Sequence, residues 1–316
     1  MGEITPAIRF EQNYRIGGRT VGMTGPSMER KIVLLTGGTS GIGREAALEL
    51  ADRGASVAIV GRNRERGRAV ASEIDTRNGD GFAEFYTTDL ASQQSVRRLT
   101  EEFRARHDRL DVLVNNAGTF RGDRGESPEK IEATLAINHL APFLLTHRLA
   151  DLLAERTPAR VLTVSSGLHN RGTIRFEDLG FEREYDAWDA YAQSKLANVL
   201  FAFELADRLP EGVTSNAVDP GFVPETALSR EGSFRGKATL GVLSKLPLPS
   251  KRSVAEGASS IVRAAADSDL DGMTGKYLKD GEPATPAEGA QDTETRRRLW
   301  DVSSGFVGIS PDAPPL

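Results

Sequence analysis

The sequence contains no cysteine and only four histidines, at His107, His139, His147 and His169. The lack of cysteine excludes disulfides, thiolate nucleophiles and cysteine-ligated metals, and it is compatible with a reducing compartment. The histidines form neither an HExxH pair nor another ligand cluster. We therefore predict no metal site.

Long apolar runs are also missing. No run approaches the roughly 18 residues that a membrane-spanning helix needs, and the first residues, MGEITPAIRF, lack the basic start and apolar centre of a secretory signal. The 45 acidic and 40 basic residues give a net charge of −5, and no dense Lys/Arg patch is interleaved with aromatic residues. We expect a cytoplasmic protein with no membrane span and no nucleic-acid partner.

Short β-branched runs alternate with longer helical stretches from Lys31 onward, after a polar, glycine-rich segment at residues 1–29. Strands this apolar are covered by helices on both faces, as in a parallel sheet. We predict an N-terminal extension at 1–29 and one doubly wound α/β Rossmann domain at 30–316, with a mainly parallel sheet of about seven strands. The predicted strands are 32–36, 56–60, 82–88, 110–116, 160–166, 213–218 and 276–278; the predicted helices are 41–53, 64–77, 92–107, 127–153 (with a kink at Pro142), 190–209, 253–266 and 293–302.

A glycine-rich segment joins the strand at 32–36 to the following helix. Glycines let the backbone approach a pyrophosphate, and a helix N-terminus supplies free N–H groups and a positive dipole. A purely structural turn would also use glycines, but the strand before and the helix after favour a dinucleotide site. The predicted cofactor residues here are Gly37, Thr39, Ser40, Gly41, Ile42 and Gly43.

Tyr191 and Lys195 are four residues apart on a predicted helix, so they share one face. A nearby ammonium, together with the positive ring of an oxidised nicotinamide, is expected to lower the pKa of the phenol from its usual value near 10. The tyrosine could then exchange a proton with a carbonyl or alcohol oxygen. The alternative is an ordinary amphipathic helix face.

Four motifs in order resemble the short-chain dehydrogenase/reductase family, over residues 31 to about 305. They are TGGTSGIG at 36–43, NNAG at 115–118, the YxxxK of Tyr191 and Lys195, and DPG at 219–221. The resemblance implies hydride transfer between a nicotinamide cofactor and a carbonyl or alcohol carbon. It assigns further cofactor contacts to Asn116, Ala117, Gly118, Tyr191, Lys195, Pro220, Gly221 and Val223.

The residues after the second strand indicate which cofactor is used. A carboxylate there would bind the ribose hydroxyl of NAD, but the chain has Arg62, which suits the 2′-phosphate of NADP(H), with Arg44 as a second candidate. The alternative for Arg62 is a solvated basic turn. Asp89 and Leu90 resemble the family's adenine contact, although Asp89 could equally cap the helix that starts near Ser92.

The resemblance also completes the catalytic set. Ser166, at the end of the strand 160–166, is the residue that would polarise the substrate oxygen; Ser165 is the alternative, and a serine here could instead cap a turn. Asn138 matches the asparagine that connects the lysine to solvent. His169 follows the serine strand, and a loop histidine is the simpler interpretation than a substrate contact.

The long segment between Ser166 and Tyr191 resembles the insertion of the retinol dehydrogenase and WW-domain oxidoreductase branch. That branch acts on bulky lipophilic carbonyls and alcohols, so we expect such a small-molecule substrate, with reduction favoured. Residues 222–250 are the predicted substrate lid, and Thr226 lies one position later than the family's usual cofactor threonine. A homodimer or homotetramer is expected from relatives that pair through the helices of Asn138 and Tyr191. The alternatives are a redox-neutral epimerisation or dehydration, or a non-catalytic NADP-binding regulator.

Overall fold

The computed structural model describes residues 13–16, 19–22, 27–77, 81–224 and 251–312. Its main sheet has eight strands in the order β10-β9-β8-β7-β6-β3-β4-β5, and every pair is parallel except β9 with β10. The doubly wound sheet is thereby confirmed. The strands are β3 (Ile32–Thr36), β4 (Ser56–Gly61), β5 (Ala83–Thr87), β6 (Val112–Asn115), β7 (Ala159–Val164), β8 (Val213–Asp219), β9 (Lys276–Lys279) and β10 (Glu282–Ala284).

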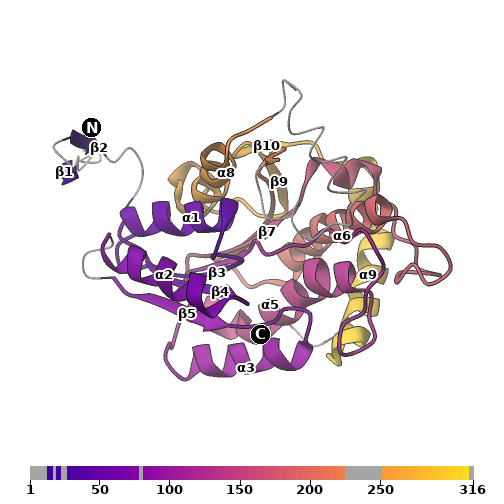
Figure 1. Cartoon of the computed structure of the whole chain (residues 1–316). Coiled ribbons are helices and arrows are strands. Elements are labelled where there is room, and N and C mark those ends of the chain that lie inside the picture. The colour runs from indigo at the N-terminus through magenta and orange to yellow at the C-terminus, as the bar shows by residue number, and fades with distance from the viewer. Residues whose placement is uncertain (1–12, 17–18, 23–26, 78–80, 225–250, 313–316) are drawn as a thin grey trace, which may run out of the picture.

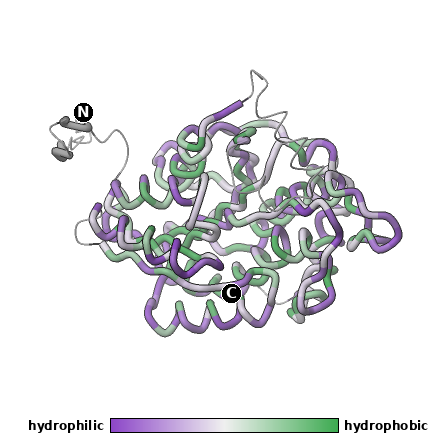
Figure 2. The backbone as a smooth tube through the Cα atoms, viewed as in Figure 1, coloured by the Kyte–Doolittle hydropathy of each residue, from purple (hydrophilic) through white to green (hydrophobic). Residues whose placement is uncertain are grey.

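Helices cover both faces of this sheet (Figure 1). One face carries α1 (Gly41–Asp52), α2 (Arg64–Asp75) and α8 (Val254–Ala266), which bury Val33 and Leu35 of β3. The other face carries α3 (Gln93–Arg104), α5 (Ala141–Ala154) and α6 (Ala187–Arg208), which bury Leu34. Figure 2 shows hydrophobic stretches along the central strands and hydrophilic ones on the outer surface. Continuous apolar strands between two helical layers are what a parallel sheet requires.

The order in which the chain adds strands to the sheet reverses between β3 and β6, although these two strands are parallel. The chain leaves β3 toward β4 and β5 and returns to pair β6 on the other side, so Leu34 faces Ala58 on one neighbour and Leu113 on the other. The loops after β3 and β6 therefore diverge at the carboxyl edge of the sheet. Open α/β folds bind ligands in the crevice that such a switch point creates.

The predicted helix at 127–153 is wrong at its start and in its middle. Ser127 forms a turn, and Glu132 caps the first helical residues by accepting hydrogen bonds from the N–H groups of Thr134 and Leu135. The helix begins with α4 (Ala133–Leu135), continues as one π-helical turn, η1 (Ala136–Leu140), and becomes α5 only afterwards. Pro142, the predicted kink, directly follows this π-helical turn, where the regular α-helical hydrogen-bond pattern is already interrupted.

Other differences lie at the ends of elements. The predicted helix at 190–209 begins three residues earlier, at Ala187, because the Asp186 carboxylate caps the N–H groups of Trp188 and Asp189. The exposed edge strand β10 was not predicted, since Glu-Pro-Ala carries no apolar pattern. Further short elements are β1 (Asn13–Ile16) paired with β2 (Arg19–Gly22), η2 (Gly167–Arg171), η4 (Ser268–Leu270) and η5 (Glu288–Ala290).

The C-terminal helix α9 (Thr293–Val307) packs against α5 and α6. Trp300 lies edge-on to Phe143 of α5 at 4.9 Å and stacks on Phe201 of α6 at 6.1 Å. The Arg208 guanidinium lies 4.4 Å from the Trp300 ring centre. Among the helices in the described ranges, none combines the length and apolar character that crossing a bilayer requires.

Candidate active site

A cavity of about 920 Å³ opens at the carboxyl ends of β3, β6, β7 and β8. Its volume is in the range of small-molecule and cofactor sites. Among the predicted site residues that the structure describes, only Arg44 and Asn138 do not line it. Those that do are Gly37, Thr39, Ser40, Gly41, Ile42, Gly43, Arg62, Asp89, Leu90, Asn116, Ala117, Gly118, Ser166, Tyr191, Lys195, Pro220, Gly221 and Val223.

The glycine turn after β3 leaves room for a phosphate next to bare backbone. A Cβ added to Gly43 would lie 2.4 Å from the carbonyl oxygen of Gly37 and 2.4 Å from Nδ2 of Asn116. Gly37 itself has a φ of +73°, which side-chain-bearing residues rarely adopt. The N-cap of α1, Ser40, makes no side-chain cap hydrogen bond, and no acidic residue occupies the first turn. These residues fit a pyrophosphate, because the N–H groups and dipole of α1 face the cavity without an internal anion.

Thr36, which sequence reasoning missed, links the loop after β3 to the loop after β6 by hydrogen bonds. Its hydroxyl oxygen accepts hydrogen bonds from the N–H groups of Asn116 and Ala117, each at 3.0 Å. The Asn116 side-chain amide donates to the Thr36 carbonyl oxygen at 2.8 Å. The β3 and β6 loops are thereby held at a fixed separation. The only sequence signal for this role was the position of Thr36 directly before the glycine motif.

The residues after β4 and β5 meet at one end of the cavity. Arg62 follows β4, and Asp89 and Leu90 follow β5. Arg44 does not join them: its guanidinium pairs with Glu73 at 2.5 Å. The cap of α3 is Ser92, whose hydroxyl accepts from Ser95 N–H, so the alternative role of Asp89 as the helix cap is wrong.

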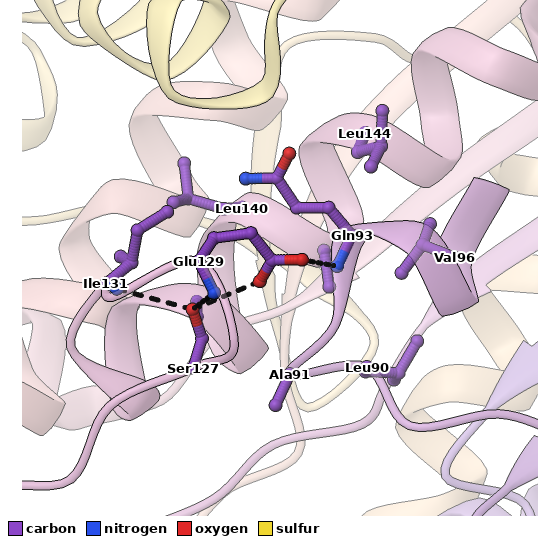
Figure 3. A pocket seen from close by; sticks show the side chains of 11 residues that line it. Leu90, Ala91, Gln93, Val96, Ser127, Glu129, Ile131, Leu140 and Leu144 are labelled. Atoms are coloured by element: carbon purple, nitrogen blue, oxygen red, sulfur yellow. Dashed lines mark hydrogen bonds between the residues drawn. The ribbon is translucent and has the colours of Figure 1, made fainter.

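A second, much smaller pocket lies beside Leu90 (Figure 3). The Glu129 carboxylate accepts hydrogen bonds from the Gln93 N–H at 2.9 Å and from the Ser127 hydroxyl at 3.1 Å. This network joins the start of α3 to the turn before α4. The loop that carries Asp89 is therefore anchored from two elements, which favours a fixed wall at that end of the large cavity.

Tyr191 and Lys195 lie on one face of α6, and both are buried. Nζ of Lys195 is 5.5 Å from the centre of the Tyr191 ring and donates to the Val164 carbonyl oxygen at 3.1 Å. Burial lowers the pKa of Lys195 to about 8, an effect that Asp219 opposes. Burial raises the pKa of Tyr191, and Asp219 raises it further. These directions hold for the residues of the chain alone; the predicted lowering of the phenol's pKa depends on the ammonium together with an oxidised nicotinamide and stays a prediction.

The two serines at the end of β7 have different partners. The Ser166 side chain lies close enough to Tyr191 to oppose the rise in the phenol's pKa, and it also caps η2 by accepting from the Leu168 N–H at 3.3 Å. The Ser165 hydroxyl donates instead to the Lys195 carbonyl oxygen at 2.8 Å, and Ser165 is only 2% exposed. Ser166 thus stands beside Tyr191 in the cavity, whereas Ser165 fastens β7 to α6.

Asn138 lies behind the cavity in the π-helical turn η1 and is fully buried. Its side-chain oxygen accepts from the Thr119 N–H at 2.7 Å, and its amide donates to the Thr119 carbonyl oxygen at 3.0 Å and to the Ser194 hydroxyl at 2.9 Å. A Cβ on Gly118 would lie 3.4 Å from Nζ of Lys195 and 3.6 Å from Oδ1 of Asn138. The asparagine therefore stands next to the lysine. π-Helical turns of this kind often occur at functional sites.

Comparison with known proteins agrees with this geometry. Residues 31–233 match the family model described as short chain dehydrogenase. The chain belongs to the short chain dehydrogenase family. It is 40% identical to retinol dehydrogenase 12 of Bos taurus over 309 residues, which cover 97% of this chain and 94% of the relative. The predicted resemblance to the retinol dehydrogenase branch is thus confirmed.

Solved structures support the same conclusion. A protein from Mycobacterium paratuberculosis has a TM-score of 0.72 at 30% identity, over 91% of this chain and 97% of that one. A short chain dehydrogenase from Shigella flexneri, solved in complex with NADP, has a TM-score of 0.63 at 26% identity, over 80% of this chain and 98% of that one. The fold of this short chain dehydrogenase is therefore shared over most of its length.

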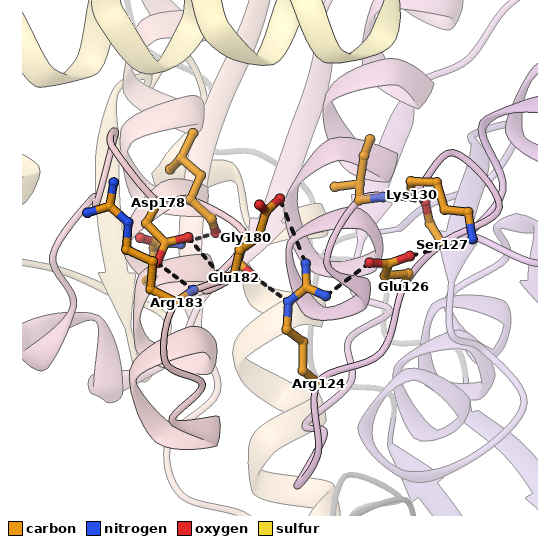
Figure 4. A network of polar contacts seen from close by, with 11 residues as sticks. Arg124, Glu126, Ser127, Lys130, Asp178, Gly180, Glu182 and Arg183 are labelled. Atoms are coloured by element: carbon orange, nitrogen blue, oxygen red, sulfur yellow. Dashed lines mark hydrogen bonds and ion pairs between the residues drawn. The ribbon is translucent and has the colours of Figure 1, made fainter.

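The insertion between Ser166 and Tyr191 packs on the loop after Gly118. Arg124 of that loop donates from Nε to the Gly180 carbonyl oxygen at 2.9 Å and pairs with Glu126 at 3.0 Å and Glu182 at 4.0 Å (Figure 4). The Tyr185 hydroxyl donates to the Arg121 carbonyl oxygen at 3.0 Å. Tyr185 is therefore a packing residue of the insertion.

Two aromatic residues that sequence reasoning missed border the site. Phe120 lies 4.8 Å from Trp188 and edge-on to Tyr191 at 5.8 Å, between ring centres, and both Phe120 and Trp188 line the cavity. Trp188 belongs to the first turn of α6, one turn before Tyr191. The residues are about 70 positions apart, so only the packing of the insertion brings them together.

His169 is buried, and both ring nitrogens have partners. Nδ1 lies 2.8 Å from the Ser166 carbonyl oxygen and Nε2 accepts from the Ala287 N–H at 3.0 Å, which places the proton on Nδ1. Burial lowers its pKa. The histidine connects the turn after the serine strand to the C-terminal segment. The predicted lid beyond Pro224, and Thr226 with it, lies outside the described residues.

Proposed function

We propose that this chain is an NADP(H)-dependent oxidoreductase that transfers hydride between the nicotinamide and a carbonyl or alcohol carbon of a bulky, apolar substrate, with reduction favoured. The observation that carries the proposal is the meeting of Tyr191, Lys195 and Ser166 in the same cavity as the glycine turn and Arg62. A cofactor lying along the switch point would extend from Arg62 toward Tyr191.

The nicotinamide, when bound, would supply or accept the hydride. Tyr191 is the proton donor to the carbonyl oxygen during reduction, and its raised pKa keeps the phenol protonated. The Ser166 hydroxyl, which lines the cavity together with Tyr191, would donate to the same substrate oxygen as negative charge develops on it. Lys195 supplies a buried positive charge beside the phenol, and Asn138 fixes the Gly118–Thr119 backbone next to that charge.

The charge of the residues directly after β4 favours NADP(H) over NAD(H). None of the three residues directly after β4 is a carboxylate, and the exposed Arg62 lines the cavity where the ribose 2′-phosphate of the cofactor would lie. The NADP complex of the Shigella flexneri relative supports this choice.

The substrate class rests on the apolar wall of the site. Phe120, Trp188, Leu168 and Phe222 line the cavity together with Tyr191. The naming of relatives as retinol dehydrogenases supports a large apolar carbonyl or alcohol. A cytoplasmic location stays a prediction. So does homo-oligomerisation, although α9 already covers part of α5 and α6, the helices through which pairing was expected.

The proposal is tested by incubating the protein with NADPH and a panel of aldehydes and ketones that runs from short and polar to bulky and apolar. Loss of NADPH absorbance should be fastest with the bulky apolar members. The Tyr191→Phe variant should still bind NADPH, measured by cofactor fluorescence, but lose about 10²-fold or more in turnover. Substrate conversion without net NADPH loss would indicate the redox-neutral alternative, and NADPH binding without any conversion would indicate the regulator.

A further inference from the structure

The cavity holds a buried carboxylate that the proposed mechanism does not use. Asp219 is the last residue of β8, is 1% exposed and lines the cavity. Its Oδ1 accepts from the Gly221 N–H at 2.9 Å, and its Oδ2 accepts from the Tyr277 hydroxyl at 2.6 Å. Both donors are neutral groups, so neither hydrogen bond compensates the negative charge of the carboxylate. A buried charge acts strongly on its neighbours because the surrounding dielectric is low.

The sheet places this carboxylate beside the catalytic pair. Val218 pairs with Val164 in the parallel ladder between β8 and β7, and Lys195 donates to the Val164 carbonyl oxygen at 3.1 Å. The Lys195 ammonium is therefore bonded to the last residue of β7, and Asp219 is the last residue of the neighbouring strand β8. Tyr191 is one helical turn before Lys195 on α6, so it faces the same region.

Several other titratable or charged side chains lie near Asp219. The His169 ring packs on Tyr277 at 4.7 Å, and Asp219 raises the pKa of that histidine against the effect of burial. Arg252, which lies against Gly221, pairs with Asp280 at 2.8 Å. The titratable and charged groups near Asp219 are thus Tyr191 and Lys195 on α6, Tyr277 and Lys279 on β9, Asp280 after it, His169 on η2 and Arg252. Of these, Tyr191, Lys195, Arg252, Lys279 and Asp280 line the cavity, and only Tyr191 and Lys195 among them are buried.

We infer that Asp219 is a positioning residue whose negative charge holds the Tyr191–Lys195 pair in its protonated form. The inference rests on the proposed function, since it assigns a role within that site. Its direction agrees with the electrostatics: Asp219 raises the pKa of both Tyr191 and Lys195. A protonated phenol is the form that donates a proton to a carbonyl, so the carboxylate favours reduction over alcohol oxidation.

The experiment compares pH profiles of kcat/KM for NADPH-dependent carbonyl reduction. In Asp219→Asn the fall in activity at high pH should move down by about one pH unit, because the pair loses a nearby negative charge. Asp219→Glu, which keeps the charge, should restore most of the original profile. Asp219→Ser serves as a second neutral variant if Asp219→Asn does not fold.

A matched control is Asp111→Asn. Asp111 is also buried, at 2% exposure, but lies at the opposite edge of the sheet, where it accepts from the Ile32 N–H and pairs with Lys31. Its variant should lose stability without a shift in the pH profile. If the neutral Asp219 variants lower the rate with an unchanged profile, or if Asp219→Glu behaves like them, the residue is merely structural and the inference is wrong.

A second readout does not depend on turnover. The NMR chemical shift of the Lys195 side chain in the NADPH-free protein, assigned by its absence from a Lys195→Arg derivative, reports the ionisation of Lys195, whose pKa is about 8. That titration should also move to lower pH when Asp219 becomes Asn. A protein that consumes no NADPH but shows this shift would defeat the proposed function and leave the role of Asp219 intact; the reverse result would do the opposite.

Discussion

The Ser165 hydroxyl donates to the carbonyl oxygen of Lys195 at 2.8 Å, so the first serine after β7 is bound to the backbone of the helix that carries Tyr191 and Lys195. The next residue, Ser166, contacts the Tyr191 side chain instead. Two adjacent serines therefore have separate tasks. One joins a strand to a helix, and the other is the proposed donor to the substrate oxygen.

Substitution of these serines should separate the two tasks. Ser166→Ala is expected to lower kcat by about 10²-fold, as for the loss of one donor to a developing oxyanion, with little change in thermal stability. Ser165→Ala should keep most activity and lose about 1 kcal/mol of stability, because the Lys195 carbonyl loses a partner. NADPH oxidation and thermal unfolding of both variants measure this. Equal rate losses in the two would contradict the assignment.

Cofactor choice should depend on Arg62. Arg62→Asp is expected to weaken NADPH binding by about 10- to 100-fold, since a charge-assisted contact to phosphate is replaced by repulsion. NADH binding should change little or improve. Fluorescence titration with each cofactor gives the ratio of dissociation constants. Arg68→Asp is the matched control, because Arg68 is an exposed residue of α2 that does not line the cavity; the same loss there would point to a general charge effect.

The closeness of Gly43 to Gly37 predicts the effect of a single methyl group. In Gly43→Ala the Cβ would meet backbone at 2.4 Å, so the turn must shift and NADPH binding should fall by at least about 10-fold. Gly305→Ala is the control, since that helical glycine has nothing within 4 Å of an added Cβ. Its variant should gain about 0.5–1 kcal/mol of stability. A Gly43→Ala protein with unchanged cofactor affinity would show that the turn is not the phosphate site.

Two histidines, the buried His139 and the half-buried His147, predict sensitivity to acid. Burial lowers the pKa of His139 and of His147 to about 4, from the usual 6.5. Between these values the unfolded chain binds protons that the folded chain does not, so stability is full above about pH 6.5 and falls as the pH drops toward 4. The slope approaches about 1.4 kcal/mol per pH unit for each histidine.

Urea unfolding followed by tryptophan fluorescence at several pH values measures that slope. His147 stacks on Phe143 at 4.5 Å and lies 4.9 Å from Trp300, and its Nε2 has no partner within the described residues. His147→Phe should therefore keep the packing and flatten the pH dependence. A slope equal to that of the unchanged protein would show that His147 does not contribute.

Much of the site could be predicted because its residues follow strands directly. Apolar runs located β3, β4, β6 and β7, and a parallel sheet brings the carboxyl ends of its strands to one edge. The residues after those strands, such as Gly37, Asn116 and Ser166, were therefore predicted to gather before any contact was known. The start of the helix predicted at 127–153 was wrong, because an apolar pattern does not show that Glu132 is the N-cap and that the helix begins only after it.

The sequence by itself determined the layered fold, the glycine turn and the four-residue spacing of Tyr191 and Lys195, since each depends on near neighbours in the chain. Only the tertiary structure decided the direction of the Tyr191 pKa, because burial and the Asp219 charge come from other elements. It also decided the hydrogen bond between Asn116 and Thr36 and the ring contact between Phe120 and Trp188. Contacts between distant residues depend on how whole elements pack, and no local pattern records that.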